Sequence, residues 1–365
     1  CAYVLPWKDH LAEELEQAGV VTHCLSRTRR DPRWPLRLVE LVRGGGWDVV
    51  HVHSPLPGSV ARLAALTVTR ADRPALVTTE HNRWATHRAP TRLLNAVSSR
   101  WDDVTFAVTD EVGCSMSGPT ARRAETLQHG IDVAATSAVA GARAAMAAEV
   151  RAEVRAELDV GADEVVVGTV ANFRPQKDYP NLLRAARLLA DREVPVRFVA
   201  VGQGPQEAEI RALHAELDLD DRVVLTGFRD DAVRVMGACD VFTMASQWEG
   251  LPVAVMEALA LGLPVVATGV GGIAEELTDG VDALLVPPGD PVALADALER
   301  VATDAGLRAE LAAASYARAA GFDVRRAVQR IEAVYDDLAR PDAVSPPRHD
   351  DAAPFPSPPP HDVPF

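Results

Sequence analysis

The 365-residue sequence has little cysteine, few aromatic residues and no long apolar run. Its four cysteines are scattered without Cys-x-x-Cys spacing, so reduced thiols in a cytosolic protein are expected, although the count alone permits disulfides. No stretch approaches the roughly 18 apolar residues that a membrane-spanning helix needs. No Gly-x-Gly-x-x-Gly follows an expected strand with an acid downstream, which argues against a dinucleotide oxidoreductase.

Basic charge is also scarce. The formal net charge is −15, and residues 1–133 hold 16 Lys/Arg against 15 Asp/Glu, so the acidic excess lies in the rest of the chain. A nucleic-acid-binding protein normally has a basic domain or patch, so no nucleic-acid partner is expected. The nearly neutral first part could face an anionic acceptor or a membrane surface, or could simply be a less acidic domain.

The apolar residues, 48% of the chain, follow a pattern that predicts an α/β protein, and the length favours two domains. Short apolar runs alternate with amphipathic stretches, which is typical of parallel sheets with crossover helices. In the first half we predict strands at residues 2–5, 20–25, 48–53, 75–80, 104–108 and 124–128, and helices near 10–17, 35–43, 58–69, 91–100 and 111–119. In the second half we predict strands at 164–170, 196–201, 222–225, 240–244, 263–268 and 283–286, and helices from 179, from 252, from 291, at 307–319 and at 324–338.

The most informative stretch is residues 246–272, SQWEGLPVAVMEALALGLPVVATGVGG. Pro252 suits the first turn of a helix and Gly262 its end, before an apolar, β-branched run that is typical of a buried strand. Glu249 precedes this helix and Glu257 lies about two turns inside it. Because carboxylates are rarely buried unpaired, Glu257 should need a partner.

This Glu-x7-Glu stretch resembles the signature of retaining glycosyltransferases of family 4, which have the two-domain GT-B fold. The resemblance implies that Glu249 approaches the donor sugar and that Glu257 binds the ribose of a nucleotide sugar. It also implies that the loop at the helix mouth contacts sugar and phosphate, through Gly250, Leu251 and Pro252, and free amides there would suit an anion. The alternative is an ordinary buried helix–strand unit with two stray acids.

The segment NFRPQKDYP is similar to the family's diphosphate-binding loop. The resemblance implies that Arg174 and Lys177 clamp the donor diphosphate and stabilise the charge that develops on it as it leaves. The usual Gly-Arg pair is Ala171-Asn172 here, and Arg174 lies two positions later than the typical arginine. For Arg174, an exposed loop cation is the alternative.

Two later turns carry further resemblance. Gly202-Gln203-Gly204-Pro205 resembles the Gly-x-Gly-Pro turn that brings backbone close to the nucleotide, which implies donor contacts at Gly202 and Gly204. A Gly-x-Gly alone would be weak evidence. In relatives the residue after the glycine of Thr226-Gly227 lies near the base, which implies a contact for Phe228.

Histidines follow two strands of the first half. His51 and His53 alternate on one strand and share a face; they could bind a metal, but no third ligand is visible, and a place at the cleft edge is the favoured interpretation. The family often has a histidine where this chain has His81, which implies a catalytic role beside the reacting sugar, with a structural histidine as the alternative. In the family a strand, a glycine-rich loop and a helix precede the segment that begins here, so we expect a truncated N-terminus and treat activity of this chain as a question.

The predicted domains follow from the same comparison of motifs. Residues 1–133 are expected to form an acceptor-side Rossmann-like domain that ends near Gln128-His129-Gly130-Ile131-Asp132. A helical linker at 134–160 leads to a donor domain at 161–322, a crossover helix at 323–340 and a disordered, proline-rich tail at 341–365.

The expected function is retaining transfer of a sugar from a UDP- or GDP-sugar to a hydroxyl acceptor, such as a glycolipid, a cell-envelope glycan or a small glycoside. No cofactor is expected beside the nucleotide sugar, and no metal site, because Asp218 and Asp220 lie in a polar turn. The protein is expected in the cytoplasm, with peripheral membrane contact through the first domain as an option. The alternatives are a non-catalytic nucleotide-sugar-binding remnant, or a GT-B epimerase or phosphorylase.

Overall fold

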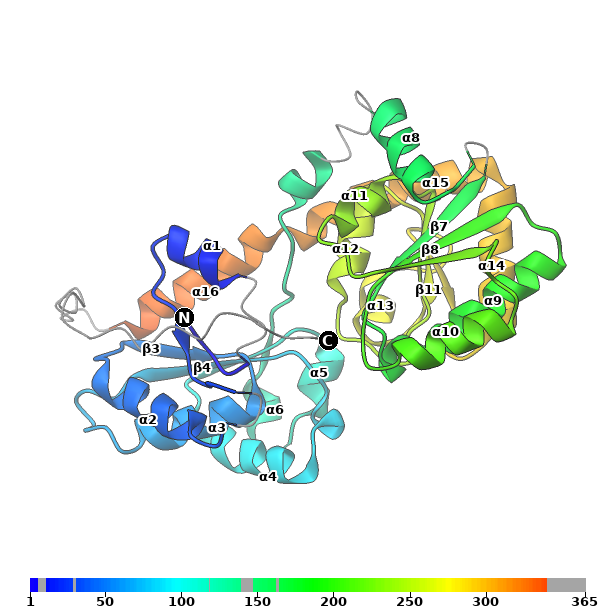
Figure 1. Cartoon of the computed structure of the whole chain (residues 1–365). Helices are drawn as coiled ribbons and strands as arrows, with labels where there is room; N and C mark the ends of the chain where they lie inside the picture. The colour runs from blue at the N-terminus through cyan, green and yellow to red at the C-terminus, as the bar shows by residue number, and fades with distance from the viewer. Residues whose placement is uncertain (6–10, 29–30, 118, 139–146, 162–163, 340–365) are drawn as a thin grey trace. The chain divides into compact units, whose positions relative to one another are not determined.

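The computed structural model describes residues 1–5, 11–28, 31–117, 119–138, 147–161 and 164–339 (Figure 1). They form two compact α/β units. The first comprises Cys1–Phe106, Ser115–Glu125 and the described residues from Ala333 on, and the second comprises Ala107–Cys114 and Thr126–Glu332. The predicted linker falls partly, and the predicted tail at 341–365 entirely, outside the described residues.

The first unit contains a four-stranded sheet, ordered β3-β4-β5-β6, and a separate pair of parallel strands, β1 and β2. All six strands lie where the alternation of apolar runs predicts them, although three are only two residues long. Their bounds are β1 Ala2–Tyr3, β2 His23–Cys24, β3 Val49–Val52, β4 Ala75–Glu80, β5 Val104–Ala107 and β6 Glu125–Thr126. The helices of this unit are α1 Ala12–Gln17, α2 Trp34–Gly44, α3 Pro55–Ala65, α4 Ala89–Ser98 and α6 Pro119–Arg123, with 3-10 turns η1 Trp84–Thr86 and η2 Ser99–Trp101. α5 Asp110–Ser115, which lies between β5 and α6 in the chain, belongs almost wholly to the second unit. The single helix predicted at 111–119 is wrong, because it is two helices, α5 and α6.

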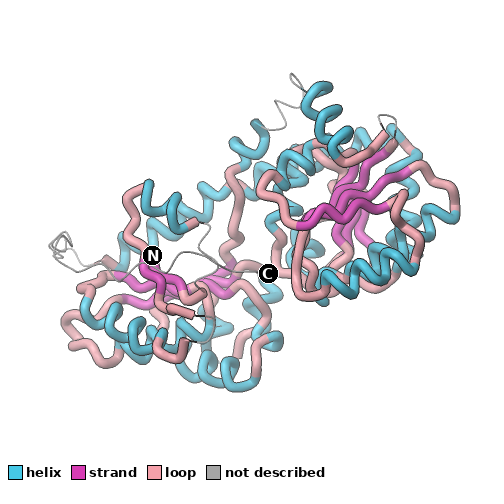
Figure 2. Tube along the Cα trace, in the orientation of Figure 1, coloured by secondary structure: helices cyan, strands magenta, loops and turns pink. Residues whose placement is uncertain are grey.

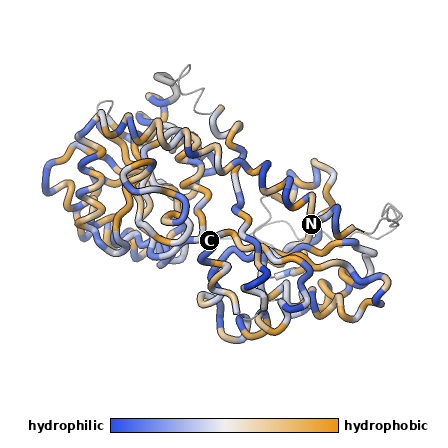
Figure 3. Tube along the Cα trace, turned by 180° about the vertical axis from the view of Figure 1, so that it is seen from behind, coloured by the Kyte–Doolittle hydropathy of each residue, from blue (hydrophilic) through white to orange (hydrophobic). Residues whose placement is uncertain are grey.

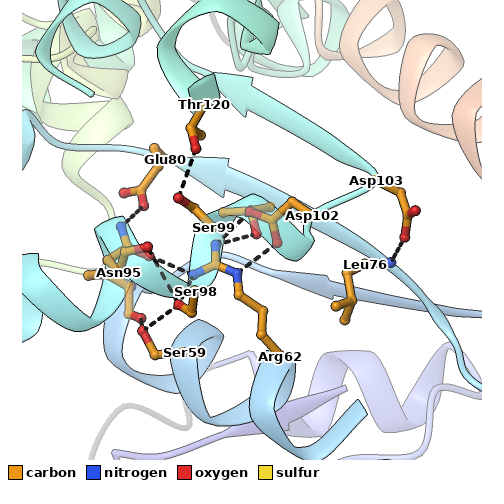
Figure 4. A network of polar contacts seen from close by, with 12 residues as sticks. Ser59, Arg62, Leu76, Glu80, Asn95, Ser98, Ser99, Asp102, Asp103 and Thr120 are labelled. Atoms are coloured by element: carbon orange, nitrogen blue, oxygen red, sulfur yellow. Dashed lines mark hydrogen bonds and ion pairs between the residues drawn. The ribbon is translucent and has the colours of Figure 1, made fainter. Parts of the chain in front are cut away.

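A buried polar network holds α3 and α4 against β4 (Figure 4). The Arg62 guanidinium is 1% exposed and donates to both carboxylate oxygens of Asp102, at 2.7 Å each. It also donates to Asn95 Oδ1, and the Asn95 amide donates to Glu80 Oε1, each at 2.6 Å. Burial raises the pKa of Asp102, and Arg62 opposes part of that rise. The network therefore fixes the end of β4, where Glu80 immediately precedes His81.

The second unit is built on a six-stranded sheet in which all five pairs of neighbouring strands are parallel. The strands are nearly continuous apolar runs, as expected where helices cover both faces of a sheet, and they are largely orange in Figure 3. Figure 2 shows these strands with helices on either side. The strand bounds are β7 Val165–Val170, β8 Val196–Val201, β9 Val223–Gly227, β10 Val241–Met244, β11 Val265–Thr268 and β12 Leu284–Val286.

The helices of the second unit include several that the sequence pattern predicts. Their bounds are α8 Ala147–Glu157, α9 Tyr179–Asp191, α10 Glu207–Glu216, α11 Ala232–Gly237, α12 Val253–Ala260, α13 Gly271–Glu276, α14 Pro291–Thr303, α15 Ala305–Ala319 and α16 Val324–Leu338, with 3-10 turns η3 Pro175–Lys177 and η4 Ala320–Phe322. α10, α11 and α13 are absent from the predicted elements. Pro252 is the N-cap of α12, so it lies just before the first helical turn and not within it.

The motif around Ile131 packs in the second unit, although it was expected to end the first domain. Ile131 and Asp323 form a parallel bridge, and the Ile131 amide donates to the Phe322 carbonyl at 2.9 Å. A Cβ on Gly130 would lie 2.4 Å from the Phe322 carbonyl oxygen, so only glycine permits this approach. α16 then continues from Asp323, with its residues from Ala333 on belonging to the first unit.

Candidate functional site

The strand order of the second unit marks a position for a ligand. The order is β12-β11-β10-β7-β8-β9, so the chain adds β8 and β9 on one side of β7 and then returns to add β10 to β12 on the other side. In open parallel sheets, ligands bind outside the carboxyl ends of the strands where the order reverses. Here that point lies between β7 and β10, whose following loops contain Lys177 and Glu249.

These two loops are joined by direct hydrogen bonds. The Gln247 amide donates to the Gln176 carbonyl at 2.8 Å, and the Gln247 side-chain amide donates to the Asp178 carboxylate. Asp178 adopts a left-handed conformation, with φ of 43°, and its carboxylate also accepts from the Asn181 amide at the start of α9. Asp178 therefore caps α9 and anchors the β10 loop, which fixes Lys177 between them.

Glu249 lies at the centre of this junction and is 6% exposed. Its Oε1 accepts from Lys177 Nζ at 2.5 Å and from Ser246 Oγ at 2.6 Å, and its Oε2 accepts from Gln176 Nε2 at 3.0 Å. The Lys177 side chain is 16% exposed. A buried carboxylate with a cation and two further donors is held rigidly. Lys177 and Glu249, which the sequence predicted in separate roles, are thus brought together as an ion pair that Gln176 and Ser246 complete.

A cavity of about 260 Å³ opens beside this ion pair. Its apolar lining includes Val170, Val201 and Met244 at the strand ends, and its rim includes Lys177, Phe228 and Arg229. The first residues of α12 close one side, where helix amides favour negative charge. Among the described residues, no hydrogen bond is formed to the backbone amides of Gly250 and Leu251. An apolar slot with a cation and a helix N-terminus at its edge suits a flat ring joined to an anion.

The glycines of the β8 loop allow its backbone to lie close to that of the β7 loop. A Cβ on Gly202 would lie 1.9 Å from the Ala171 carbonyl oxygen, and one on Gly204 would lie 2.5 Å from that of Phe173. Gly202 lines the cavity, whereas Gly204 does not and instead lies against the backbone of Phe173 in the β7 loop. Gly271, with φ of 50°, similarly crosses the Glu249 carbonyl, where a Cβ would lie 1.9 Å away. These glycines are therefore needed because the backbones of neighbouring loops approach each other too closely for a side chain.

Glu257 does not have the protein partner that its apolar helix suggests. The side chain is half-buried and, among the described residues, forms no hydrogen bond or ion pair. Burial raises the pKa of this carboxyl above its usual value. A carboxylate in this setting gains from any ligand that donates hydrogen bonds to it.

The remaining predicted donor residues divide by position. Phe228 is 63% exposed and lines the cavity, and Pro252 lines it as well. Arg174 is exposed at the start of η3 and does not line the cavity. Sequence reasoning missed Arg229, which follows Phe228 directly and is held by both carboxylate oxygens of Asp231, at 2.7 and 2.8 Å. Its position next to Phe228 was the available signal.

His81 belongs to a cluster of three histidines in the first unit. His81 Nε2 lies 3.1 Å from His53 Nδ1, and the His53 ring stacks on His51 with centroids 4.4 Å apart. His51 also contacts the Tyr335 hydroxyl of α16 at 2.6 Å and Thr79 Oγ1 at 2.8 Å. Burial, followed by the charges of His53 and His81, lowers the pKa of His51 to about 3, so this ring is neutral at physiological pH.

The described residues contain no group of three or more His, Cys, Asp or Glu side chains arranged to hold a metal ion.

No helix in the part of the chain that the structure describes has both the length and the apolarity of a membrane span.

Comparison with known proteins places the two halves of the chain. Residues 3–135 match the family described as Glycosyltransferase Family 4, and residues 150–318 match the family described as Glycosyl transferases group 1. The chain is 32% identical over 329 residues to a D-inositol 3-phosphate glycosyltransferase of Kribbella flavida, covering 82% of this chain and 73% of that protein. It is 37% identical over 174 residues to a 2-deoxystreptamine glucosyltransferase of Streptomyces kanamyceticus, covering 47% of this chain but only 45% of that protein.

A solved structure shares the fold. HepE of Anabaena, solved in complex with UDP-glucose, matches with a TM-score of 0.73 at 23% identity over 89% of this chain and 88% of HepE. Two Rossmann-like units with parallel sheets, in a chain that aligns with glycosyltransferases along most of its length, define a GT-B glycosyltransferase. The chain belongs to glycosyltransferase family 4, as its Glu-x7-Glu stretch predicts.

Proposed function

We propose that the protein transfers a sugar, with retention of anomeric configuration, from a UDP- or GDP-sugar to a hydroxyl acceptor. The observation that carries this proposal is the cavity at the reversal of strand order, with Lys177 on its rim and Glu249 bound to Lys177 beside it. UDP is the first donor nucleotide to test, because the fold neighbour HepE was solved with UDP-glucose.

The residues around the cavity have separate roles in this proposal. The base would lie on the apolar lining near Phe228, and the ribose hydroxyls would donate to Glu257, whose raised pKa reflects burial without a protein partner. The diphosphate would face Lys177 and the start of α12, so charge developing on the leaving group meets groups already oriented for it. Glu249 would orient the donor sugar. Because Lys177 and the helix amides supply positive charge, we propose that transfer requires no divalent cation.

On the acceptor side we propose that His81, whose ring contacts His53, is a catalytic residue beside the reacting sugar. We propose a cytoplasmic protein whose first unit reaches a membrane surface as a peripheral contact. The acceptor is a hydroxyl of a glycolipid, a cell-envelope glycan or a small glycoside, and the assay must therefore sample all three classes.

The test is an assay in chelator with UDP- and GDP-sugars, each offered with and without a mixture of hydroxyl acceptors. We expect nucleotide release that depends on acceptor, and an α-linked product from an α-linked donor by NMR. Glu249→Gln should lower turnover by roughly 100-fold or more, since it removes a charged group from the reacting centre. Glu216→Gln, on the exposed face of α10, is the matched control and should leave turnover unchanged.

Other outcomes would identify the alternatives. Donor consumption without acceptor indicates an epimerase, and dependence on inorganic phosphate indicates a phosphorylase. Donor binding without turnover in every condition indicates a non-catalytic binding protein. An inverted product or full loss of activity in chelator would contradict the retaining, metal-independent mechanism.

A further inference from the structure

One exposed apolar strip in the first unit serves none of the roles described above. Leu93, Leu94 and Val97 are 66%, 46% and 47% exposed, and all three lie on α4. Positions 93, 94 and 97 fall on one side of the helix at the i, i+3 and i+4 spacings. Exposed large apolar residues clustered on one helix mark an interaction site more often than scattered ones do.

The opposite side of α4 is fully used in packing. Asn95 and Ser98 are buried, and they bond to Glu80, to Arg62 and to Ser59 of the network drawn in Figure 4. This anchoring fixes which side of α4 faces outward. In Figure 1, α4 lies along the lower edge of the first unit, with no other labelled element of that unit beyond it. The apolar strip is therefore a presented surface on a rigid helix.

The charge along the segment that contains the strip has one sign. Residues 81–101 contain four arginines, at 83, 88, 92 and 100, and no aspartate or glutamate, in a chain whose net charge is −15. Arg88, Arg92 and Arg100 are exposed, and the Arg100 guanidinium lies over the Trp101 ring, 4.7 Å from its centroid. Exposed apolar side chains flanked by arginines match the boundary between acyl chains and anionic head groups.

A cavity of about 380 Å³ opens beside the same strip. Arg92 and Leu93 line it together with Trp84, Ser115 and Ser117. The Trp84 ring is 2% exposed, and its Nε1 has no hydrogen-bond partner among the described residues. Arg92 likewise forms no ion pair with any residue that the structure describes. Guanidinium and hydroxyl donors around one opening suit a phosphate group.

We propose that the α4 surface, defined as Arg88, Arg92, Leu93, Leu94 and Val97, docks on a bilayer of anionic lipids. Leu93, Leu94 and Val97 enter the acyl boundary, while the arginines meet lipid phosphates at and beside the cavity. This inference locates the membrane contact proposed above. Only the biological reason for docking rests on the proposed function, because docking itself needs neither donor nor acceptor.

The experiment is co-sedimentation of the whole protein with vesicles of phosphatidylcholine alone or with about 30% phosphatidylglycerol. We expect binding to the anionic vesicles that falls with added salt. Leu93→Asn with Leu94→Asn, and separately Arg88→Gln with Arg92→Gln, should each weaken this binding by about 10-fold or more. The matched controls are Leu36→Asn, at a leucine of α2 that is 64% exposed, and Arg70→Gln, at an exposed loop arginine.

Equal vesicle binding by the α4 variants and the controls would overturn the proposal, as would no vesicle binding by the unmodified protein. Full competition of vesicle binding by millimolar glycerol 3-phosphate would also overturn it, because that result indicates a site for a free phosphate compound. So would a dimer in sedimentation analysis that the leucine variants abolish, because that result indicates that a second copy of the chain covers the surface. Circular dichroism confirms folding of each variant. Nucleotide binding by the same variants reports separately on the donor site, so failure of docking and failure of the proposed function remain distinguishable.

Discussion

Residue by residue, the proposed donor site is organised around two carboxylates in contrasting surroundings. Glu249 has a cation and two further donors, whereas Glu257 is half-buried with no partner among the described residues. The resemblance of the motif implies separate roles for these two acids. Their surroundings separate a carboxylate that is already neutralised from one whose ionised form is disfavoured, as expected if they contact different parts of one ligand.

Glu257 should make stability depend on pH. Its folded-state pKa is raised above the ordinary value of 4.5, so its contribution to stability is fully present below that value and is lost as pH rises through the folded pKa. Glu257→Gln should therefore flatten the fall in the free energy of unfolding above pH 4.5, measured by urea denaturation from pH 4 to pH 8. The exposed Glu216→Gln should leave the profile unchanged. Identical profiles for the unmodified protein and Glu257→Gln would show that burial does not perturb this carboxyl.

At the scale of elements, the loops after β7, β8 and β10 form one interlocked unit. The β8 loop crosses the β7 loop at Gly202, and the β10 loop bonds to η3 through Gln247. The sequence predicted these strands closely, because fully buried strands are continuous apolar runs with few alternatives. It could not predict the loop contacts, since the partners of Gln176, Gln247 and Asp178 are set by strand order, which periodicity does not encode. The same limit explains the omission of Arg229.

Gly202→Ala tests this interlocking. Its Cβ would lie 1.9 Å from a backbone oxygen, which no side-chain rotation relieves, so we expect a loss of about 1–3 kcal/mol in the free energy of unfolding. Nucleotide binding should weaken with it, because the β7 loop must move. Gly237→Ala, at the end of α11 with nothing within 4 Å of its Cβ, is the control and should be neutral or slightly stabilising. Equal thermal stability of the two variants would contradict the account.

At the scale of the whole molecule, the functional signals fall into two units with different kinds of surface. The second unit holds the cavity, the ion pair and the helix N-terminus that suit a nucleotide diphosphate. The first holds the histidine cluster and the arginine-flanked α4 surface. The α/β class and the GT-B fold followed from the alternation of runs and from Glu-x7-Glu. Recognition of the α4 surface required the structure, because a helix of this composition is equally compatible with burial until Asn95 and Ser98 are seen to face inward.

The most direct test of the donor site is calorimetric titration of the whole protein with UDP, GDP and their sugars, in chelator. We predict micromolar binding of one nucleotide, and a loss of roughly 10- to 100-fold in Lys177→Ala, which removes a charged hydrogen-bond donor. Arg211→Ala, at an exposed arginine of α10 in the same unit, should bind normally. Arg174→Ala tests whether this exposed arginine, immediately before η3, also contributes to nucleotide binding. Unchanged nucleotide affinity in a folded Lys177→Ala variant would contradict the assignment of this cavity as the donor site.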